Sequence, residues 1–330
     1  MDLLFGKGFS LKRFLICGVI AIFVLGASSA WAQKTVRLSI ATGGTGGVYY
    51  PLGKGLANVI TKYIPYAEAT AEVTTASVDN CNLIGMGKAD LAFMMADSGW
   101  EAYHGKGQFK EKIPLRTVAV LYPNNMHIVT LEGNGIGKMT DLKGKRVSTG
   151  APRSGTEVMT IRVLEAYGLN PNKDIIRERL GVSESTGALK DKKIDAYFWV
   201  GGLPTASVTD LGATPGIKMK LIGHEDVIPK MREKYGPLYV KGIIPSKTYP
   251  GQDQDVPISV VWNILACHEK MKDEVAYDIA KTLFDRRTDL VAFHREAGNL
   301  ALGPQAAGGS PIPFHPGAIR YFTEKGLKIK

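Results

Sequence analysis

Residues 36–63 of this 330-residue chain read VRLSIATGGTGGVYYPLGKGLANVITKY, and this stretch indicates the fold. Val36, Leu38 and Ile40 alternate with polar residues, which predicts a strand over 35–41. A glycine-rich turn follows. Apolar residues then recur at helical spacing from Leu52 to Tyr63, which predicts a helix over 50–63. A strand, a tight loop and a helix in this order are typical of the start of an α/β fold.

The same succession of elements is predicted twice along the chain. In the first pass, strands near 70–75 and 90–94 enclose a helix that Ser77 could cap. The second pass has strands at 146–149, 175–180 and 195–199, a helix over 157–167 and another over 183–190 that Ser183 could cap. We interpret the two passes as similarly wound lobes, with chance similarity between α/β segments as the alternative. Ligands of open α/β sheets bind at the carboxyl ends of strands, so facing lobes would form a cleft.

Two apolar segments, 118–131 and 260–266, are predicted to connect the lobes. They place lobe I at 33–128 plus 262–330 and lobe II at 129–261. Residues 247–257 between them are rich in Pro, Gly, Gln and Asp, which predicts a surface loop. A helix with Val275, Ile279 and Leu283 on one face and a short helix at 316–325 are predicted to close the chain.

The N-terminus is typical of a secretory signal peptide. Lys7, Lys12 and Arg13 precede an apolar run at 14–25, and Ala30-Trp31-Ala32 matches an A-x-A cleavage site. The apolar run is shorter than the roughly 20 residues of a membrane span. We therefore expect residues 1–32 to be removed by cleavage after Ala32 and the mature protein to be periplasmic, away from cytoplasmic nucleotide pools.

Composition restricts the protein class. The chain is 45% hydrophobic and 22% charged, as in ordinary globular proteins, and its length suggests about two domains. A formal net charge of +10 favours anionic partners only weakly, and nothing points to nucleic acid. Three cysteines exclude a disulfide scaffold. Cys81 and Cys267 could pair or could both be buried thiols.

No catalytic or cofactor motif is complete. Val48 and Gly55 each break the P-loop pattern, and Tyr49 breaks G-x-G-x-x-G. The chain lacks G-x-S-x-G, and His268 does not continue as H-E-x-x-H. The histidines are dispersed, without zinc spacing. These absences predict a protein that is not an enzyme and that holds neither a metal nor a cofactor.

Two loops are candidate anion sites. The glycine turn at 43–47 opens a helix, and successive backbone N–H groups there can bind an anion; a tight turn without a ligand is the alternative. In the second loop, Ser154 and Thr156 could cap a helix or bind a ligand oxygen, and capping is the expected role of Thr156. Arg153 could clamp a carboxylate or face water. Among the aromatic residues near these loops, including Trp199, Tyr49 is the one expected at the pocket rather than in the core.

Residues 40–53 (IATGGTGGVYYPLG) and 76–80 (ASVDN) resemble the TAXI class of solute-binding proteins, which serve tripartite ATP-independent periplasmic (TRAP) transporters. Supporting runs are found at 141–147, 150–156, 249–253 and 315–318. The resemblance covers essentially the whole mature chain. Arg153 departs from it, because a small or neutral residue is expected there, and Cys81 replaces an aliphatic residue.

The resemblance implies a type II periplasmic-binding-protein fold, with two α/β lobes joined by a hinge and the ligand cleft between them. It implies a monomer that captures a small organic acid, glutamate-like or 2-oxoglutarate-like, and delivers it to TRAP membrane subunits. A sensor that presents the same ligand to a membrane receptor is the alternative. A secreted enzyme would need a nucleophile–base pair, and the sequence offers none. The predicted ligand-binding residues are Gly44, Thr45, Gly46, Gly47, Tyr49, Ser77, Asn80, Arg153, Ser154, Gly155 and Thr156.

Overall fold

The computed structural model describes residues 35–306 and 309–329, so the predicted signal peptide lies outside the described residues. The chain divides into a unit over Met1–Val36 and a unit over Arg37–Lys330, and the fold described below belongs to the second.

The first pass of the chain forms one α/β half. Its strand β3 is apolar and buried at every position, as expected for a strand covered on both faces. Helix α2 buries Leu52, Leu56, Val59 and Ile60, which confirms the helical periodicity. The elements are β1 (Val36–Ala41), α2 (Tyr49–Tyr63), β2 (Ala67–Glu72), α3 (Ser77–Gly85), β3 (Leu91–Met95) and α4 (Ala96–His104).

The second pass forms a half with the same winding. Its strands follow the order β6-β5-β7, and those of the first half follow β2-β1-β3. The pairs β1–β3, β5–β6 and β5–β7 are all parallel. The predicted repetition of the winding is therefore confirmed. The elements are β5 (Arg146–Ser148), α5 (Gly155–Ala166), β6 (Ile176–Glu178), α6 (Val182–Lys190), β7 (Ala196–Gly201), α7 (Ala206–Ala213), β8 (Met219–Leu221), α8 (Ile228–Tyr235) and β9 (Val240–Ile244).

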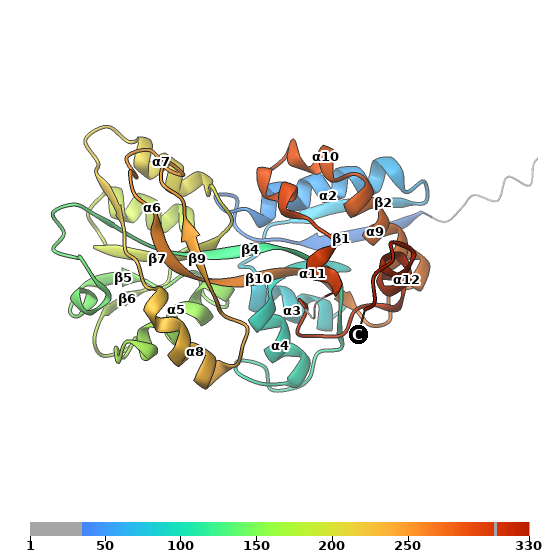
Figure 1. Ribbon diagram of the computed structural model, residues 1–330, viewed down its shortest axis with the longest axis horizontal. Coiled ribbons are helices and arrows are strands. Elements are labelled where there is room, and N and C mark those ends of the chain that lie inside the picture. Colours follow the sequence, from blue (N-terminus) through green and yellow to red (C-terminus); the bar gives the residue numbers. More distant parts are fainter. Residues whose placement is uncertain (1–34, 307–308, 330) are drawn as a thin grey trace, which may run out of the picture. The chain divides into compact units, whose positions relative to one another are not determined.

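Two long strands, β4 (Leu115–Leu131) and β10 (Val256–His268), belong to both halves (Figure 1). They pair with each other in antiparallel register; β10 also pairs with β3, and β4 also pairs with β7. The apolar segments predicted as connections are thus the central strands of one ten-stranded sheet. Both predicted lobe boundaries, 128/129 and 261/262, fall inside these strands. Residues 256–257, predicted as loop, already belong to β10.

The C-terminal helices return to the first half, where α9 and α10 pack against α2 and α12 packs against α9 (Figure 1). They are α9 (Asp273–Asp285), α10 (Arg287–Val291), α11 (Gly303–Ala306) and α12 (Pro316–Glu324); short 3₁₀ turns lie at η1 (Met139–Leu142), η2 (Glu225–Val227) and η3 (Arg295–Asn299). Two identically wound α/β halves, linked by two antiparallel strands and closed by C-terminal helices, form the predicted type II periplasmic-binding-protein fold.

Candidate functional site

A cavity of about 270 Å³ lies between the two halves. It is lined by the glycine turn, the segment before α3, the loop before α5, the start of α6 and the end of β7, and by two side chains of β4. The lining residues are Gly43, Gly44, Thr45, Gly47, Val48, Tyr49, Val73, Thr74, Thr75, Ala76, Ser77, Met95, Tyr122, Asn124, Gly150, Ala151, Ser154, Gly155, Thr156, Leu180, Gly181, Val182, Ser183, Glu184, Trp199, Val200 and Gly201.

The first residues of four helices line this cavity. Tyr49 begins α2, Ser77 begins α3, Gly155 begins α5 and Val182 begins α6. Two of these helices belong to each half, so the repeated winding places them around one space. A helix N-terminus carries about half a positive elementary charge and N–H groups without intrahelical partners. The cavity wall is therefore electropositive without any cationic side chain among its lining residues.

The glycine turn contributes to the cavity through Gly44, Thr45, Gly47 and Tyr49. Tyr49 is buried and donates its hydroxyl hydrogen to Asn263 of β10. Burial raises the pKa of this hydroxyl above its ordinary value, so Tyr49 stays a neutral donor. Tyr49 thus lies at the pocket, where the sequence placed it.

Gly46 does not line the cavity but joins the two halves. Its carbonyl oxygen accepts hydrogen bonds from Ser207 Oγ at 3.3 Å and from the Ser207 backbone N–H at 3.4 Å. A Cβ atom at Gly46 would lie 2.1 Å from Ser183 Oγ and 2.2 Å from Ser207 Oγ. No glycine of this fully described turn adopts a left-handed conformation. Gly46 is therefore required by close approach rather than by backbone freedom.

Ser77 and Asn80 support the site in different ways. Ser77 lines the cavity, and its hydroxyl accepts a hydrogen bond from the Met95 N–H at 3.1 Å. The expected N-cap role of Ser77 is wrong, because α3 starts at Ser77 and Ala76 stands at the cap position. Asn80 is fully buried away from the cavity, where its amide donates to the carbonyls of Thr42 and Phe93 at 2.7 Å each.

In the second loop the capping residue is Ser154. Its hydroxyl accepts a hydrogen bond from the Glu157 N–H at 3.1 Å at the start of α5. The expectation that Thr156 caps is wrong, since Thr156 Oγ1 instead accepts from the Val200 N–H of β7 at 3.3 Å. Ser154, Gly155 and Thr156 all line the cavity. A Cβ atom at Gly155 would lie 2.6 Å from Ser77 Oγ, so the two loops meet closely here.

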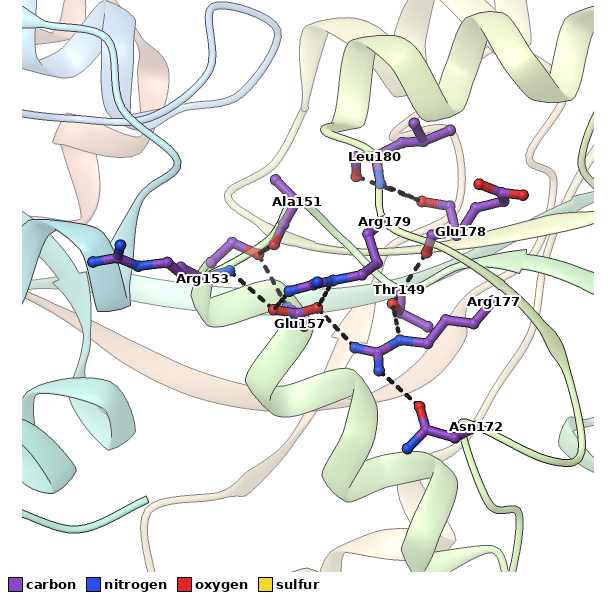
Figure 2. A network of polar contacts seen from close by, with 11 residues as sticks. Thr149, Ala151, Arg153, Glu157, Asn172, Arg177, Glu178, Arg179 and Leu180 are labelled. Atoms are coloured by element: carbon purple, nitrogen blue, oxygen red, sulfur yellow. Dashed lines mark hydrogen bonds and ion pairs between the residues drawn. The ribbon is translucent and has the colours of Figure 1, made fainter. Parts of the chain in front are cut away.

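The Arg153 guanidinium lies outside the cavity, with its side chain about half exposed. It pairs with Asp79 of α3 at 3.1 Å. In Figure 2 the Arg153 side chain extends away from Glu157 and the two arginines that surround Glu157. The backbone N–H of Arg153 donates to Glu157, whose buried carboxylate also pairs with Arg177 and Arg179 of the β6 segment (Figure 2). These arginines hold the second loop through Glu157, and Arg153 joins that loop to the first half.

A further contact between the halves is ionic and, unlike the Arg153–Asp79 pair, buried. Arg162 of α5 donates to Asp97 of α4 at 3.0 Å and also pairs with Glu101. Tyr239 donates to the same Asp97 oxygen at 2.7 Å. Asp97 and Arg162 are each buried, and burial raises the pKa of Glu101 above its usual value. Helices α4 and α5 are thus joined by charges that lie almost out of contact with water.

The sequence analysis missed Tyr122 and Asn124, which lie on the same face of β4 and line the cavity. The signal for them was the polar pair Asn124-Asn125 directly after the apolar run at 118–123 of β4. Trp199, expected in the core, also lines the cavity, and its indole N–H donates to Thr205 Oγ1 at 2.8 Å.

The two cysteines and two of the histidines are buried in the fold and do not line the cavity. Cys81 and Cys267 are both buried, free thiols, which decides between the two alternatives. His127 and His224 are fully buried; their Nε2 atoms lie 2.7 Å from the Tyr249 hydroxyl and 3.0 Å from the Ser259 hydroxyl. Within 35–306 and 309–329, no three His, Cys, Asp or Glu side chains are grouped to hold a metal ion.

In the part of the chain that the structure describes, no helix is long and apolar enough to cross a membrane.

Comparison with known proteins places the chain in a family. Solved structures similar to this chain include the alkanesulfonate-binding protein SsuA from Xanthomonas axonopodis pv. citri bound to MOPS (16% identity, 89% of this chain and 81% of that chain, TM-score 0.48). Another is the substrate-binding protein of an amino acid ABC transporter (12% identity, 78% of this chain and 97% of that chain, TM-score 0.47). A third is the GluR0 ligand-binding core in complex with L-glutamate (8% identity, 81% of this chain and 98% of that chain, TM-score 0.46).

The sequence profile of the NMT1-like family matches residues 40–326, from the end of β1 to beyond α12. Because this match extends over most of its length, the chain belongs to the NMT1-like family.

Proposed function

We propose that this chain is an extracytoplasmic solute-binding protein of the TAXI type. In this role it captures a small organic acid anion, glutamate-like or 2-oxoglutarate-like, and delivers it to the membrane subunits of a TRAP transporter. The proposal includes periplasmic location after cleavage behind Ala32. The observation that carries it is the convergence of four helix N-termini on one cavity between two similarly wound halves.

The predicted residues that line the cavity offer such a solute neutral polar groups; Glu184 also lines it and brings a carboxylate. Gly44, Thr45, Gly47 and Tyr49 would contact it from the first half together with Ser77, and Ser154, Gly155 and Thr156 would contact it from the second. Backbone N–H groups at helix starts can bind a carboxylate without a charged side chain. Of the other predicted residues, Gly46 and Arg153 would act by holding the halves together and Asn80 by supporting the wall.

A thermal-shift screen of organic acids and amino acids, with glutamate and 2-oxoglutarate among them, tests the proposal. A solute that binds only the folded protein stabilises it by RT ln(1 + [L]/Kd), about 2.7 kcal/mol at one hundred times Kd. We expect at least one carboxylic acid to raise the melting temperature, and uncharged sugars to leave it unchanged. A screen in which no carboxylate has an effect would contradict the proposed ligand class. Intact mass of the secreted protein tests cleavage after Ala32.

A further inference from the structure

Two residues that line the cavity each have a polar side-chain atom without a hydrogen-bond partner among the described residues. The hydroxyl of Tyr122 and the amide oxygen Oδ1 of Asn124 are buried and make no hydrogen bond with any described residue. Both residues line the cavity from the same face of β4. A buried polar group without a partner destabilises the folded state, so such groups are rare and need an explanation.

We infer, building on the proposed function, that Tyr122 and Asn124 contact the bound solute and select one that has a hydrogen-bond donor and a single net negative charge. The amide oxygen of Asn124 can only accept a hydrogen bond. An ionised dicarboxylate without a hydroxyl or amino group offers acceptors alone, so it would leave this oxygen unpaired.

The charge of the cavity leads to the same class of solute. Four helix N-termini together provide about two positive elementary charges. Among the described lining residues one carries a charge, the carboxylate of Glu184, which is exposed at the start of α6 and offsets part of that potential. The remaining positive potential of the helix N-termini balances about one negative charge on the solute. A second carboxylate on the solute would enter the cavity without a matching cation, which is unfavourable.

Four five-carbon acids separate the two requirements by calorimetry. Pentanoate and 2-hydroxypentanoate carry one negative charge, glutarate and 2-hydroxyglutarate carry two, and the hydroxy acids alone supply the donor. We expect 2-hydroxypentanoate to bind most tightly and glutarate most weakly. We expect the hydroxyl group to lower the dissociation constant about tenfold and the second carboxylate to raise it about tenfold. Each change corresponds to a free energy of about the size of one hydrogen bond. Glu184→Gln should reduce the penalty on glutarate.

Variants test the two side chains directly. Tyr122→Phe and Asn124→Leu should each weaken 2-hydroxypentanoate binding about tenfold and leave pentanoate binding unchanged. Without a solute, neither variant should lower the melting temperature, because each removes a polar atom that has no hydrogen-bond partner among the described residues. Thr160→Val is the matched control: Thr160 Oγ1 is also buried and has no hydrogen-bond partner within 35–306 and 309–329, but Thr160 does not line the cavity. Thr160→Val should not lower the melting temperature either, and it should not change the affinity for 2-hydroxypentanoate.

The outcomes are distinct. Glutarate binding as tightly as 2-hydroxypentanoate overturns the inference and leaves the proposed function intact. The inference is also overturned if Tyr122→Phe and Asn124→Leu both keep affinity within twofold, or if both lower the melting temperature of the empty protein by several degrees. If none of the four acids binds and the wider screen finds no carboxylate, the proposed function fails and the inference fails with it.

Discussion

The close contact of Gly46 with α6 and α7 gives a sharp prediction about closure over a solute. Gly46→Ala places a methyl carbon 2.1 Å from Ser183 Oγ and 2.2 Å from Ser207 Oγ, and both hydroxyls must rotate away. That rotation removes the hydrogen bond from Ser207 to Gly46 and the 3.2 Å bond between the two serines. Two such bonds contribute about 1–3 kcal/mol, so binding should weaken roughly 5- to 150-fold.

The contact joins the two halves, so the substitution should act on the closed, loaded form and not on an open, empty one. Calorimetry measures the affinity for an acid identified by the thermal-shift screen. Small-angle scattering measures the radius of gyration, which should decrease on loading in the natural protein and less so in the variant. The melting temperature without solute should stay the same.

Three further variants make the reasoning specific. Replacing Ser183 and Ser207 by Ala in the Gly46→Ala background removes both clashing atoms, and the Cβ atom of residue 183, at 3.4 Å, is then the nearest neighbour of the new methyl group. The added methyl group should then carry little further penalty over the two serine substitutions alone. Gly187→Ala, on α6 with no atom within 4 Å of its added Cβ, should be neutral. Affinity and compaction of Gly46→Ala equal to those of the natural protein would refute a closing contact at this position.

Three further predictions follow from other contacts. Arg153→Ala should change solute affinity less than about fivefold by calorimetry, because the half-exposed guanidinium pairs with Asp79; a hundredfold loss would place it against the solute. Arg162→Met leaves Asp97 and Glu101 buried without a cation and should lower the unfolding free energy in urea by about 3–5 kcal/mol; a loss below about 1 kcal/mol would contradict the buried pairing. Burial lowers the pKa of His127 and His224 from 6.5 to about 4, so between these values the unfolded chain binds more protons, and stability falls as pH falls. Urea titrations should show a loss of about 2 kcal/mol per histidine at pH 5 relative to pH 8, and a smaller pH dependence in His224→Gln.

Local periodicity predicted most of the elements because it depends on neighbours in the chain. The alternation at 36–40 and the helical spacing from Leu52 were enough for β1 and α2. Helix α4 was missed, since it follows β3 without a turn residue between them. The predicted capping by Ser183 is wrong, because α6 starts at Val182 with Gly181 at the cap position. The exact helix starts at Ser77 and Val182 could not be predicted, because a serine hydroxyl can bond to a distant part of the fold instead of capping: Ser77 Oγ accepts from Met95, and Ser183 Oγ bonds to Ser207 Oγ.

The candidate site was predictable where it lies on loops and not where it depends on distant partners. The two loops carry recognisable glycine and serine patterns, and eight of the predicted residues line the cavity: Gly44, Thr45, Gly47, Tyr49, Ser77, Ser154, Gly155 and Thr156. Arg153 is different, because its partner Asp79 lies in the other half of the fold. Tyr122 and Asn124 were hidden within a strand that was interpreted as a connection.

The position of β10 in the sheet has a consequence for how the chain is made. This strand lies between β3 and β4, yet its residues are among the last strand residues to be synthesised. A nascent chain that ends before Val256 lacks the strand that joins its first half to β4, so neither half can complete its packing early. If the predicted secretory signal directs export, we expect this late completion of the sheet to delay folding until synthesis is nearly finished, which would help the chain to cross a membrane.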